Sequence, residues 1–167
     1  MTPQELLQEY RRNPQRGFDQ IYQAFADRLT TYLRRSFSLS LEEIGDVVHD
    51  AFLPWVAEPA RMSKVESLSG YLFATVRNLA LQARKHRLTP VPESFDPAGP
   101  SFQEHLESSI QIEQTLSRLP EEQREAVVLR IWGDLSFEEI AGIQQVPLQT
   151  AAARYRYGLQ KLEEMMS

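Results

Sequence analysis

The chain has 167 residues, of which 42% are apolar and 25% charged, the balance of an ordinary folded protein with one medium domain or two small ones. It contains no cysteine, which excludes disulfide scaffolds, cysteine-ligated zinc, iron–sulfur clusters and thiol chemistry. Its three histidines never pair at helical spacing, and we expect no metal site and no cofactor.

The formal net charge of −5 is unevenly distributed. Residues 1–89 hold 12 basic and 10 acidic side chains, a net charge of +2, whereas residues 110–167 hold 6 and 9, a net charge of −3. The N-terminus lacks the basic-then-apolar order of a signal peptide, and no apolar run is long enough to span a membrane. We therefore expect a cytoplasmic protein without membrane insertion.

Helical periodicity dominates the chain and strand patterns are nearly absent, which predicts an all-α fold. Apolar stripes in the first part of the chain span residues 18–33, 41–55 and 72–83. Ser40, followed three residues later by Glu43, predicts a capping box at the start of the second helix. Pro54 is expected to kink or end that helix.

A proline-rich stretch then interrupts the helices. Four prolines and one glycine occur within the twelve residues from Thr89 to Pro100, and a helix cannot continue through them. We place a linker at residues 90–107, between an N-terminal helical module (residues 1–89) and a C-terminal one (residues 108–167).

The C-terminal module has the pattern of a helix-turn-helix. Helices are expected at residues 110–119, 121–132, 137–144 and 148–165. Ser136 and Glu139 predict a second capping box, and Pro147 predicts a tight turn between a short helix and a longer one. The buried stripe of the longer helix is expected to contain Leu148, Ala151, Ala152, Tyr155, Leu159 and Leu162.

Such a longer helix can read the major groove of DNA. Its outer face is expected to carry Gln149, Thr150, Ala153, Arg154, Arg156 and Tyr157. The alternative is an αα-hairpin in a bundle with a solvated face, and the acidic balance of this module favours that alternative, since phosphate contacts supply most non-specific affinity for DNA.

The third helix of the N-terminal module has a basic outer face. Opposite its apolar stripe lie Arg77, Asn78, Leu81, Arg84 and Lys85, with Arg87 close by. Such side chains contact phosphates and base edges, and the nearby aromatic residues Tyr71 and Phe73 are candidates for stacking on an unpaired base. A merely solvated basic face is the alternative.

The second helix has an acidic outer face instead. This face carries Glu42, Asp46, His49 and Leu53, with Asp50 alongside. An exposed leucine among carboxylates suits a protein partner better than DNA, although a solvated acidic face remains the alternative.

Five strings, in order and spacing, resemble those of bacterial RNA polymerase sigma factors of the extracytoplasmic-function (ECF) type in the sigma-70 family. They are Asp46-Val-Val-His-Asp-Ala-Phe52, Gly70-Tyr-Leu-Phe-Ala-Thr-Val-Arg-Asn-Leu-Ala80, Leu119-Pro-Glu-Glu-Gln-Arg-Glu125, Leu135-Ser-Phe-Glu-Glu-Ile-Ala141 and Pro147-Leu-Gln-Thr150. The resemblance covers roughly residues 15–89 and 108–165. It implies sigma region 2, a linker and sigma region 4.

The resemblance also implies roles for single residues. Asp46, His49, Asp50 and Phe52 would dock on the β′ clamp helices of core RNA polymerase, and region 4 would contact the β flap. Tyr71, Arg77, Asn78, Arg84, Lys85 and Arg87 would bind the −10 element, next to a base-flipping loop at about residues 58–69. Gln149, Thr150, Ala153, Arg154, Arg156 and Tyr157 would face the −35 element, and the linker would run toward the RNA exit channel.

Family members are usually held inactive by an anti-sigma factor, which is an expectation for this chain as well. Ala151 to Ala153 stand where the family usually has a basic residue and a serine, which predicts weak or unusual binding of the −35 element.

No catalytic group is apparent, because the chain has no glycine-rich phosphate loop, nucleophile elbow or metal-ligand cluster. The acidic residues are expected on outer faces and caps. The sequence thus predicts a non-enzymatic promoter-specificity subunit that binds core polymerase and promoter DNA. The alternatives are a stand-alone helix-turn-helix regulator and a sigma-like interaction protein that no longer reads DNA.

Overall fold

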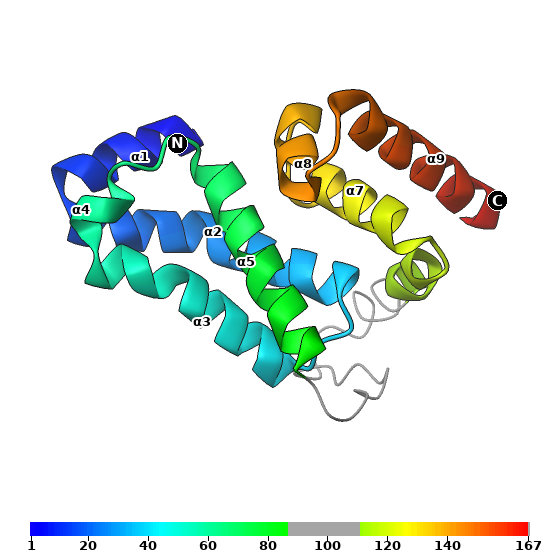
Figure 1. Cartoon of the computed structure of the whole chain (residues 1–167), viewed down its shortest axis with the longest axis horizontal. Helices are drawn as coiled ribbons and strands as arrows, with labels where there is room; N and C mark the ends of the chain where they lie inside the picture. Colours follow the sequence, from blue (N-terminus) through cyan, green and yellow to red (C-terminus); the bar gives the residue numbers. More distant parts are fainter. Residues whose placement is uncertain (87–110, 167) are drawn as a thin grey trace.

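The computed structural model describes residues 1–86 and 111–166, which are helical and contain no strand (Figure 1). The all-α prediction is confirmed. The helices are α1 (Pro3–Arg12), α2 (Pro14–Ser36), α3 (Leu41–Ala57), α4 (Pro59–Met62), α5 (Leu68–Lys85), α7 (Glu121–Ile131), α8 (Phe137–Gln144) and α9 (Leu148–Met166), with a further helical segment at residues 111–117. The expected linker and Arg87 lie outside the described residues.

Both predicted capping boxes are present. The Ser40 hydroxyl accepts from the backbone N–H of Glu43, while the Glu43 carboxylate accepts from the backbone N–H of Ser40. Ser136 and Glu139 make the same reciprocal pair at the start of α8. These boxes fix where α3 and α8 begin, because they satisfy backbone donors that have no partner inside the helix.

The second helix does not end at Pro54, which lies inside α3. The tertiary environment of Trp55 holds the last turn in place. Trp55 is buried, and its carbonyl accepts a hydrogen bond of 2.6 Å from the Tyr10 hydroxyl. The helix therefore runs three residues past the proline, to Ala57, before the chain turns into α4.

Helix α1 was not predicted. Its start signals are present in the sequence, since Thr2 caps the helix through the N–H of Glu5 and Pro3 occupies the first helical position. Leu6, Leu7 and Tyr10 are buried against the rest of the N-terminal module. The helix packs on α2 where Gly17 leaves room for the Tyr10 backbone.

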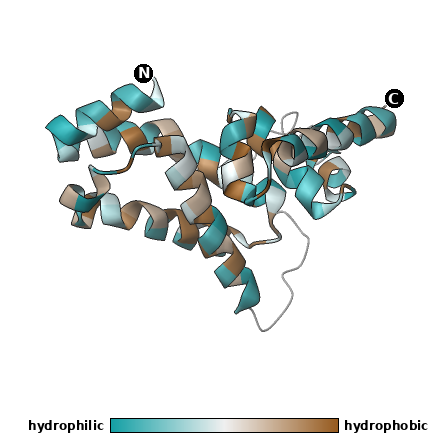
Figure 2. Cartoon of the chain, turned by 45° about the horizontal axis from the view of Figure 1, so that its top comes forward, coloured by the Kyte–Doolittle hydropathy of each residue, from teal (hydrophilic) through white to brown (hydrophobic). Residues whose placement is uncertain are grey.

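The two modules pack against each other. Helix α2 contacts α7, and α5 contacts α8, so segments on either side of the linker lie side by side (Figure 1). The buried apolar residues of both modules form one cluster, and brown, hydrophobic positions face the spaces between helices (Figure 2). The fold is thus one body built from two modules.

The stripe predicted for the last helix is partly wrong. Leu148 is 47% exposed and stands at the first position of α9. The residues of α9 that are fully buried are Ala151 and Gly158, seven positions apart on one face. A Cβ at Gly158 would lie 2.8 Å from Cγ2 of Val127, so the absence of a side chain lets α9 approach α7 closely.

Candidate DNA and partner interfaces

The basic face of α5 is only partly free. Asn78 and Lys85 are exposed, and Tyr71 is half-buried with its ring edge-on to Trp55 at a centroid distance of 5.9 Å. Arg77 and Arg84, in contrast, are paired with carboxylates of the C-terminal module. The structure thus brings five of the six predicted residues onto one helix and already engages two of them.

Phe73 cannot stack on a base in this conformation. Its side chain is fully buried, with its ring edge-on to Tyr32 at a centroid distance of 5.5 Å and to Phe25 at 6.5 Å. The prediction from sequence was wrong because Phe73 faces α2 of its own module, where Phe25 and Tyr32 cover it. Tyr71 remains the aromatic candidate on this helix.

The segment that precedes α5 is fixed by α1. The Arg11 guanidinium donates from Nε to the carbonyl of Ser63 and from Nη2 to the carbonyl of Val65, each at 2.9 Å. Arg61 and Glu58 form an exposed ion pair of 2.8 Å across α4. The segment expected as a loop at residues 58–69 thus contains α4, and helix α1 holds the turn between α4 and α5 through a contact that only the fold reveals.

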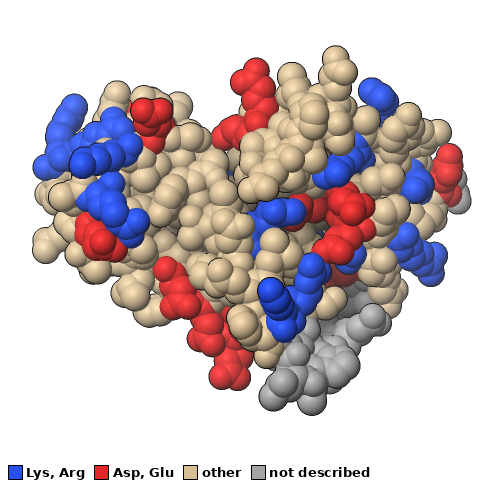
Figure 3. All heavy atoms as spheres, viewed as in Figure 1, with Lys and Arg blue, Asp and Glu red and all other residues tan. Residues whose placement is uncertain are grey.

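The acidic face of α3 adjoins a hollow. Asp46, His49 and Asp50 are exposed as predicted, and Figure 3 shows a row of acidic side chains where α3 runs. Phe52 is instead 3% exposed and lies at the base of a hollow of about 330 Å³ between α2 and α3. Phe52 therefore contributes to the α3 surface by lining the hollow, and not as an exposed side chain.

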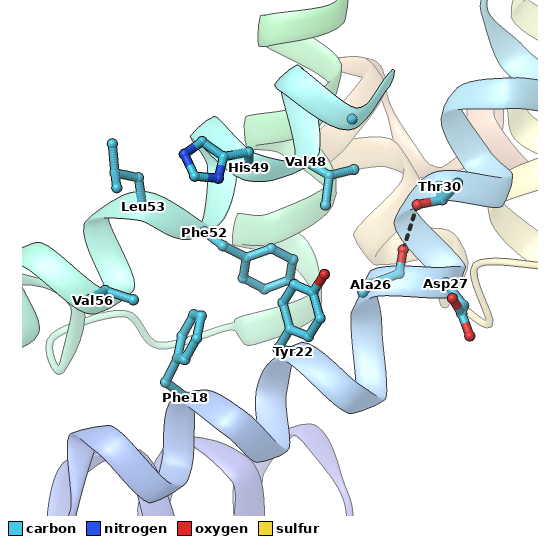
Figure 4. A pocket seen from close by; sticks show the side chains of 11 residues that line it. Phe18, Tyr22, Ala26, Asp27, Thr30, Val48, His49, Phe52, Leu53 and Val56 are labelled. Carbon is cyan, nitrogen blue, oxygen red and sulfur yellow. Dashed lines mark hydrogen bonds between the residues drawn. The ribbon is translucent and has the colours of Figure 1, made fainter. Parts of the chain in front are cut away.

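Aromatic and aliphatic side chains line this hollow, which we call the α2–α3 pocket. Phe52 packs on Tyr22 at a ring-centroid distance of 5.1 Å, and Phe18 approaches both rings (Figure 4). Leu53 and Val56 are 51% and 62% exposed at its edge. An apolar hollow beside carboxylates suits an amphipathic partner with basic side chains.

The helix-turn-helix of α8 and α9 has the predicted geometry. Gln145 adopts the left-handed conformation at φ 59° and ψ 48°, which ends α8 and turns the chain toward α9. Among the predicted DNA-reading residues of α9, Gln149, Arg156 and Tyr157 are exposed, and Thr150, Ala153 and Arg154 are half-buried. Arg154 donates to the Gln144 side-chain oxygen at 3.3 Å.

The burial of the Glu125 side chain was not expected from the sequence. It is 6% exposed, although the acidic residues were expected on outer faces. One carboxylate oxygen accepts from the Tyr32 hydroxyl at 2.9 Å and from Nε of Arg77 at 3.1 Å, and the other accepts from Nε2 of Gln144 at 2.9 Å. We call these four residues the Glu125 cluster.

Charge within the Glu125 cluster is well compensated. Burial, reinforced by the negative charge of Glu125, raises the pKa of Tyr32 well above its usual value, so its hydroxyl stays protonated and donates. Arg77 supplies the balancing positive charge. Two donors come from the N-terminal module and one from the C-terminal module, so the carboxylate is satisfied only when the modules are together.

Among residues 1–86 and 111–166, no group of three or more metal-ligating side chains is clustered. No helix in that part of the chain is long and apolar enough to cross a membrane.

Residues 109–162 match the family described as sigma-70, region 4. The chain is 25% identical over 162 residues to the ECF RNA polymerase sigma factor RpoE of Cereibacter sphaeroides, covering 90% of this chain and 87% of that protein. It is 25% identical over 173 residues to the RNA polymerase sigma factor CarQ of Myxococcus xanthus, covering 96% and 95% of the two chains.

Two solved structures share the fold over nearly the whole chain. One is CnrH in complex with the cytosolic domain of CnrY, with a TM-score of 0.68, 20% identity and coverage of 98% of this chain and 96% of that one. The other is the sigma factor RpoE in complex with the anti-sigma factor NepR from Bartonella quintana, with a TM-score of 0.67, 21% identity and coverage of 89% and 96%. The region 4 match and the relatives that span both modules make this chain similar, along almost its whole length, to RNA polymerase sigma factors of the ECF type.

Proposed function

We propose that this chain is a promoter-specificity subunit that binds core RNA polymerase, recognises −10 and −35 elements and initiates transcription. The observation that carries the proposal is that relatives named as RNA polymerase sigma factors match both modules, over 90% or more of the chain. The chain contributes no catalytic group, since polymerase performs the chemistry, and it acts where polymerase is, in the cytoplasm.

The N-terminal module, residues 1–89, docks on polymerase through α3. Asp46, His49 and Asp50 present an exposed acidic surface, and Phe52 shapes the adjoining α2–α3 pocket. The β′ clamp helices of polymerase are the proposed partner of this face. The carboxylates would attract a basic partner surface, and the apolar hollow beside them would bury apolar side chains of that partner.

The same module binds the −10 element through α5. Asn78 and Lys85 are exposed, and the half-buried Tyr71 lies two turns before Asn78 on the same side of the helix. An unpaired base stacked on an aromatic side chain gains about 1–3 kcal/mol, which offsets the cost of unstacking it from DNA. Arg77, Arg84 and Arg87 would hold the phosphates around that base.

The C-terminal module, residues 108–167, binds the −35 element through α9. Gln149, Arg156 and Tyr157 are exposed on the face that would enter the major groove, flanked by Thr150, Ala153 and Arg154. The three alanines from Ala151 to Ala153 leave few donors for base edges, so we propose that region 4 relies on contacts with the polymerase β flap as well.

We also propose an anti-sigma factor as a partner. The two solved structures named above are complexes, one with the cytosolic domain of CnrY and one with the anti-sigma factor NepR. The exposed apolar edge of the α2–α3 pocket, with Leu53 and Val56, gives such a protein an apolar surface to cover.

Run-off transcription with core polymerase on a library of genomic fragments tests the function. Transcripts that start downstream of a shared pair of −10 and −35 elements are the expected result. A shared −10 element without a −35 element would mean that α9 has lost base readout. Symmetric footprints without polymerase would instead support a stand-alone regulator, and tight polymerase binding without transcripts would support a sequestering protein.

Two pairs of variants test the assigned faces. Asn78→Ala with Lys85→Ala is expected to abolish promoter opening with polymerase binding retained, whereas Arg12→Ala, which removes one exposed cation from α1, serves as the control. Asp46→Ala with Asp50→Ala is expected to weaken polymerase binding, with Glu163→Ala on α9 as the control. Equal effects of variant and control would refute the assignment of that face.

A further inference from the structure

Helix α9 has a buried side and an outward side. Helices α7 and α8 pack on it, its buried residues are Ala151 and Gly158, and it lies at the edge of the fold (Figure 1). Successive residues of a helix turn by about 100°, so Gln149, Ala153 and Arg156 lie on the opposite side, within about 60° of one another. Gln149 and Arg156 are exposed and Ala153 is half-buried. We call these three residues the α9 strip.

The length of the α9 strip matches a few base pairs of DNA. An α-helix rises about 1.5 Å per residue, so Gln149 and Arg156 are separated by about 10 Å along the helix axis. Base pairs stack about 3.4 Å apart, and the strip therefore spans about three base-pair steps. It lies in the first half of α9, and the N-terminal residues of a recognition helix are those that contact base edges.

The side chains of the strip match different groups in the major groove. The amide of Gln149 can donate to N7 of an adenine and accept from its N6 amino group, which is a bidentate contact. Ala153 offers a methyl group without donor or acceptor, and the group in the groove that suits it is the C5 methyl of thymine. The Arg156 guanidinium can donate to a guanine or to a phosphate.

Other contacts keep the strip poor in positive charge. Arg154 points away from it, since its guanidinium donates to the side-chain oxygen of Gln144 on α8 at 3.3 Å. The Arg156 guanidinium lies over the ring of Tyr157, 5.4 Å from its centroid. A surface with few cations gains little affinity from phosphates, so contacts with bases supply a larger share of its affinity for DNA.

We propose that α9 reads A·T base pairs in the −35 element, with Gln149 recognising an adenine and Ala153 recognising the C5 methyl of a thymine about two base-pair steps away. The proposal rests on the function proposed above and adds to it the base preference of the same surface. The alanine at position 153 then serves as a specificity residue, through a methyl contact that needs no donor.

Removal of one methyl group from the DNA tests the role of Ala153. The full chain, immobilised and at low salt, selects from duplexes with a run of randomised base pairs, and the enriched duplexes should share an adenine and a thymine within about four base pairs. Deoxyuridine pairs as thymidine does and lacks only the C5 methyl. Replacing each thymine of an enriched duplex in turn should weaken binding at one position by about fourfold, the effect of one buried methyl group.

Two glycine variants assign that methyl contact to one residue. Ala153→Gly should remove the difference in affinity between thymine and uracil, whereas Ala152→Gly should keep it. Both variants make the same change to the helix, and the two side chains point about 100° apart. The readout is the ratio of two affinities measured on the same variant, so a general loss of stability cancels out of it.

A modified adenine tests Gln149 in the same way. 7-Deazaadenine lacks the N7 acceptor, and its use in the enriched duplex should weaken binding of the unmodified chain by about fivefold. Gln149→Ala should bind both duplexes equally. Gln160→Ala makes the same change at an exposed glutamine in the second half of α9 and should keep the difference.

Three results would overturn the proposal. They are the enrichment of no shared sequence, uracil replacements without effect at every thymine, and equal loss of the thymine preference in Ala152→Gly and Ala153→Gly.

The selection requires neither polymerase nor a promoter. A failed run-off assay together with the expected effects of uracil and 7-deazaadenine would therefore refute the proposed function and leave the base preference standing. Transcribed promoters whose −35 elements lack the selected adenine and thymine would refute the base preference alone.

Discussion

Gly17 and Gly45 allow the packing of α1 to be tested with one substitution made at two sites. Both glycines lie inside helices, where alanine is favoured over glycine by about 1 kcal/mol. A Cβ at Gly45 meets nothing within 4 Å. A Cβ at Gly17 would lie 2.3 Å from Cα and 2.6 Å from N of Tyr10.

The clash at Gly17 involves backbone, so no side-chain rotation relieves it. Ordinary contact begins near 3.4 Å, and α1 would have to move by roughly 1 Å relative to α2. Tyr10 is fully buried, with its hydroxyl on the Trp55 carbonyl and its ring edge-on to Trp55 at 5.0 Å, and these contacts would loosen. We expect a packing cost of about 3 kcal/mol, hence a net destabilisation of about 2 kcal/mol.

Thermal unfolding followed by far-ultraviolet circular dichroism measures both effects. Gly17→Ala should lower the Tm by about 4–8 °C, and Gly45→Ala should raise it by about 1–4 °C. Similar increases for the two variants would refute the close approach of α1 and α2, because only that contact separates them.

Three further predictions concern the loop, the turn and the buried phenol. Arg11→Ala should speed amide hydrogen exchange around Ser63 and Val65 by about tenfold, since two hydrogen bonds to that loop are lost; unchanged exchange would show that the loop is stable by itself. Gln145→Gly should stabilise the chain by about 1 kcal/mol, because only glycine adopts the left-handed conformation freely; a lower Tm would refute this. Burial raises the pKa of Tyr32, so above about pH 10 the unfolded chain ionises first and the free energy of unfolding falls by up to about 1.4 kcal/mol per pH unit. Urea unfolding of Tyr32→Phe should show a shallower fall over that range, and identical slopes would contradict the assignment.

Local features of the fold could be predicted from the sequence because their causes are local. A serine and a glutamate three residues apart fix a helix start whatever surrounds them, and both capping boxes lie where expected. Helix α1 carries equally local signals, since Thr2 and Pro3 are enough to predict where it begins. Pro54 is different, because tertiary contacts of Trp55 outweigh a local preference to stop.

The residues of the candidate site also differ in whether their surroundings are local in the chain. A helical wheel places Asn78 and Lys85 correctly on the exposed face of α5, since one helix and one core determine it. It cannot place Arg77 under α7, because its partner Glu125 is 48 residues away in the chain and belongs to another module. Phe73 is a different case, because it lies three residues before Val76 and seven before Ala80, so a helical wheel already assigns it to the buried side of α5.

The position of Trp132 gives the chain an optical reporter. Its indole lies half-buried between the modules beneath the Arg35 guanidinium, while the other tryptophan of the 167 residues, Trp55, is buried within the N-terminal module. Replacing Trp55 by phenylalanine would leave a single indole at the boundary. Its emission would move to longer wavelength as the modules part, so the rate of opening becomes measurable by stopped flow, in unlabelled protein and in the presence of any partner that lacks tryptophan.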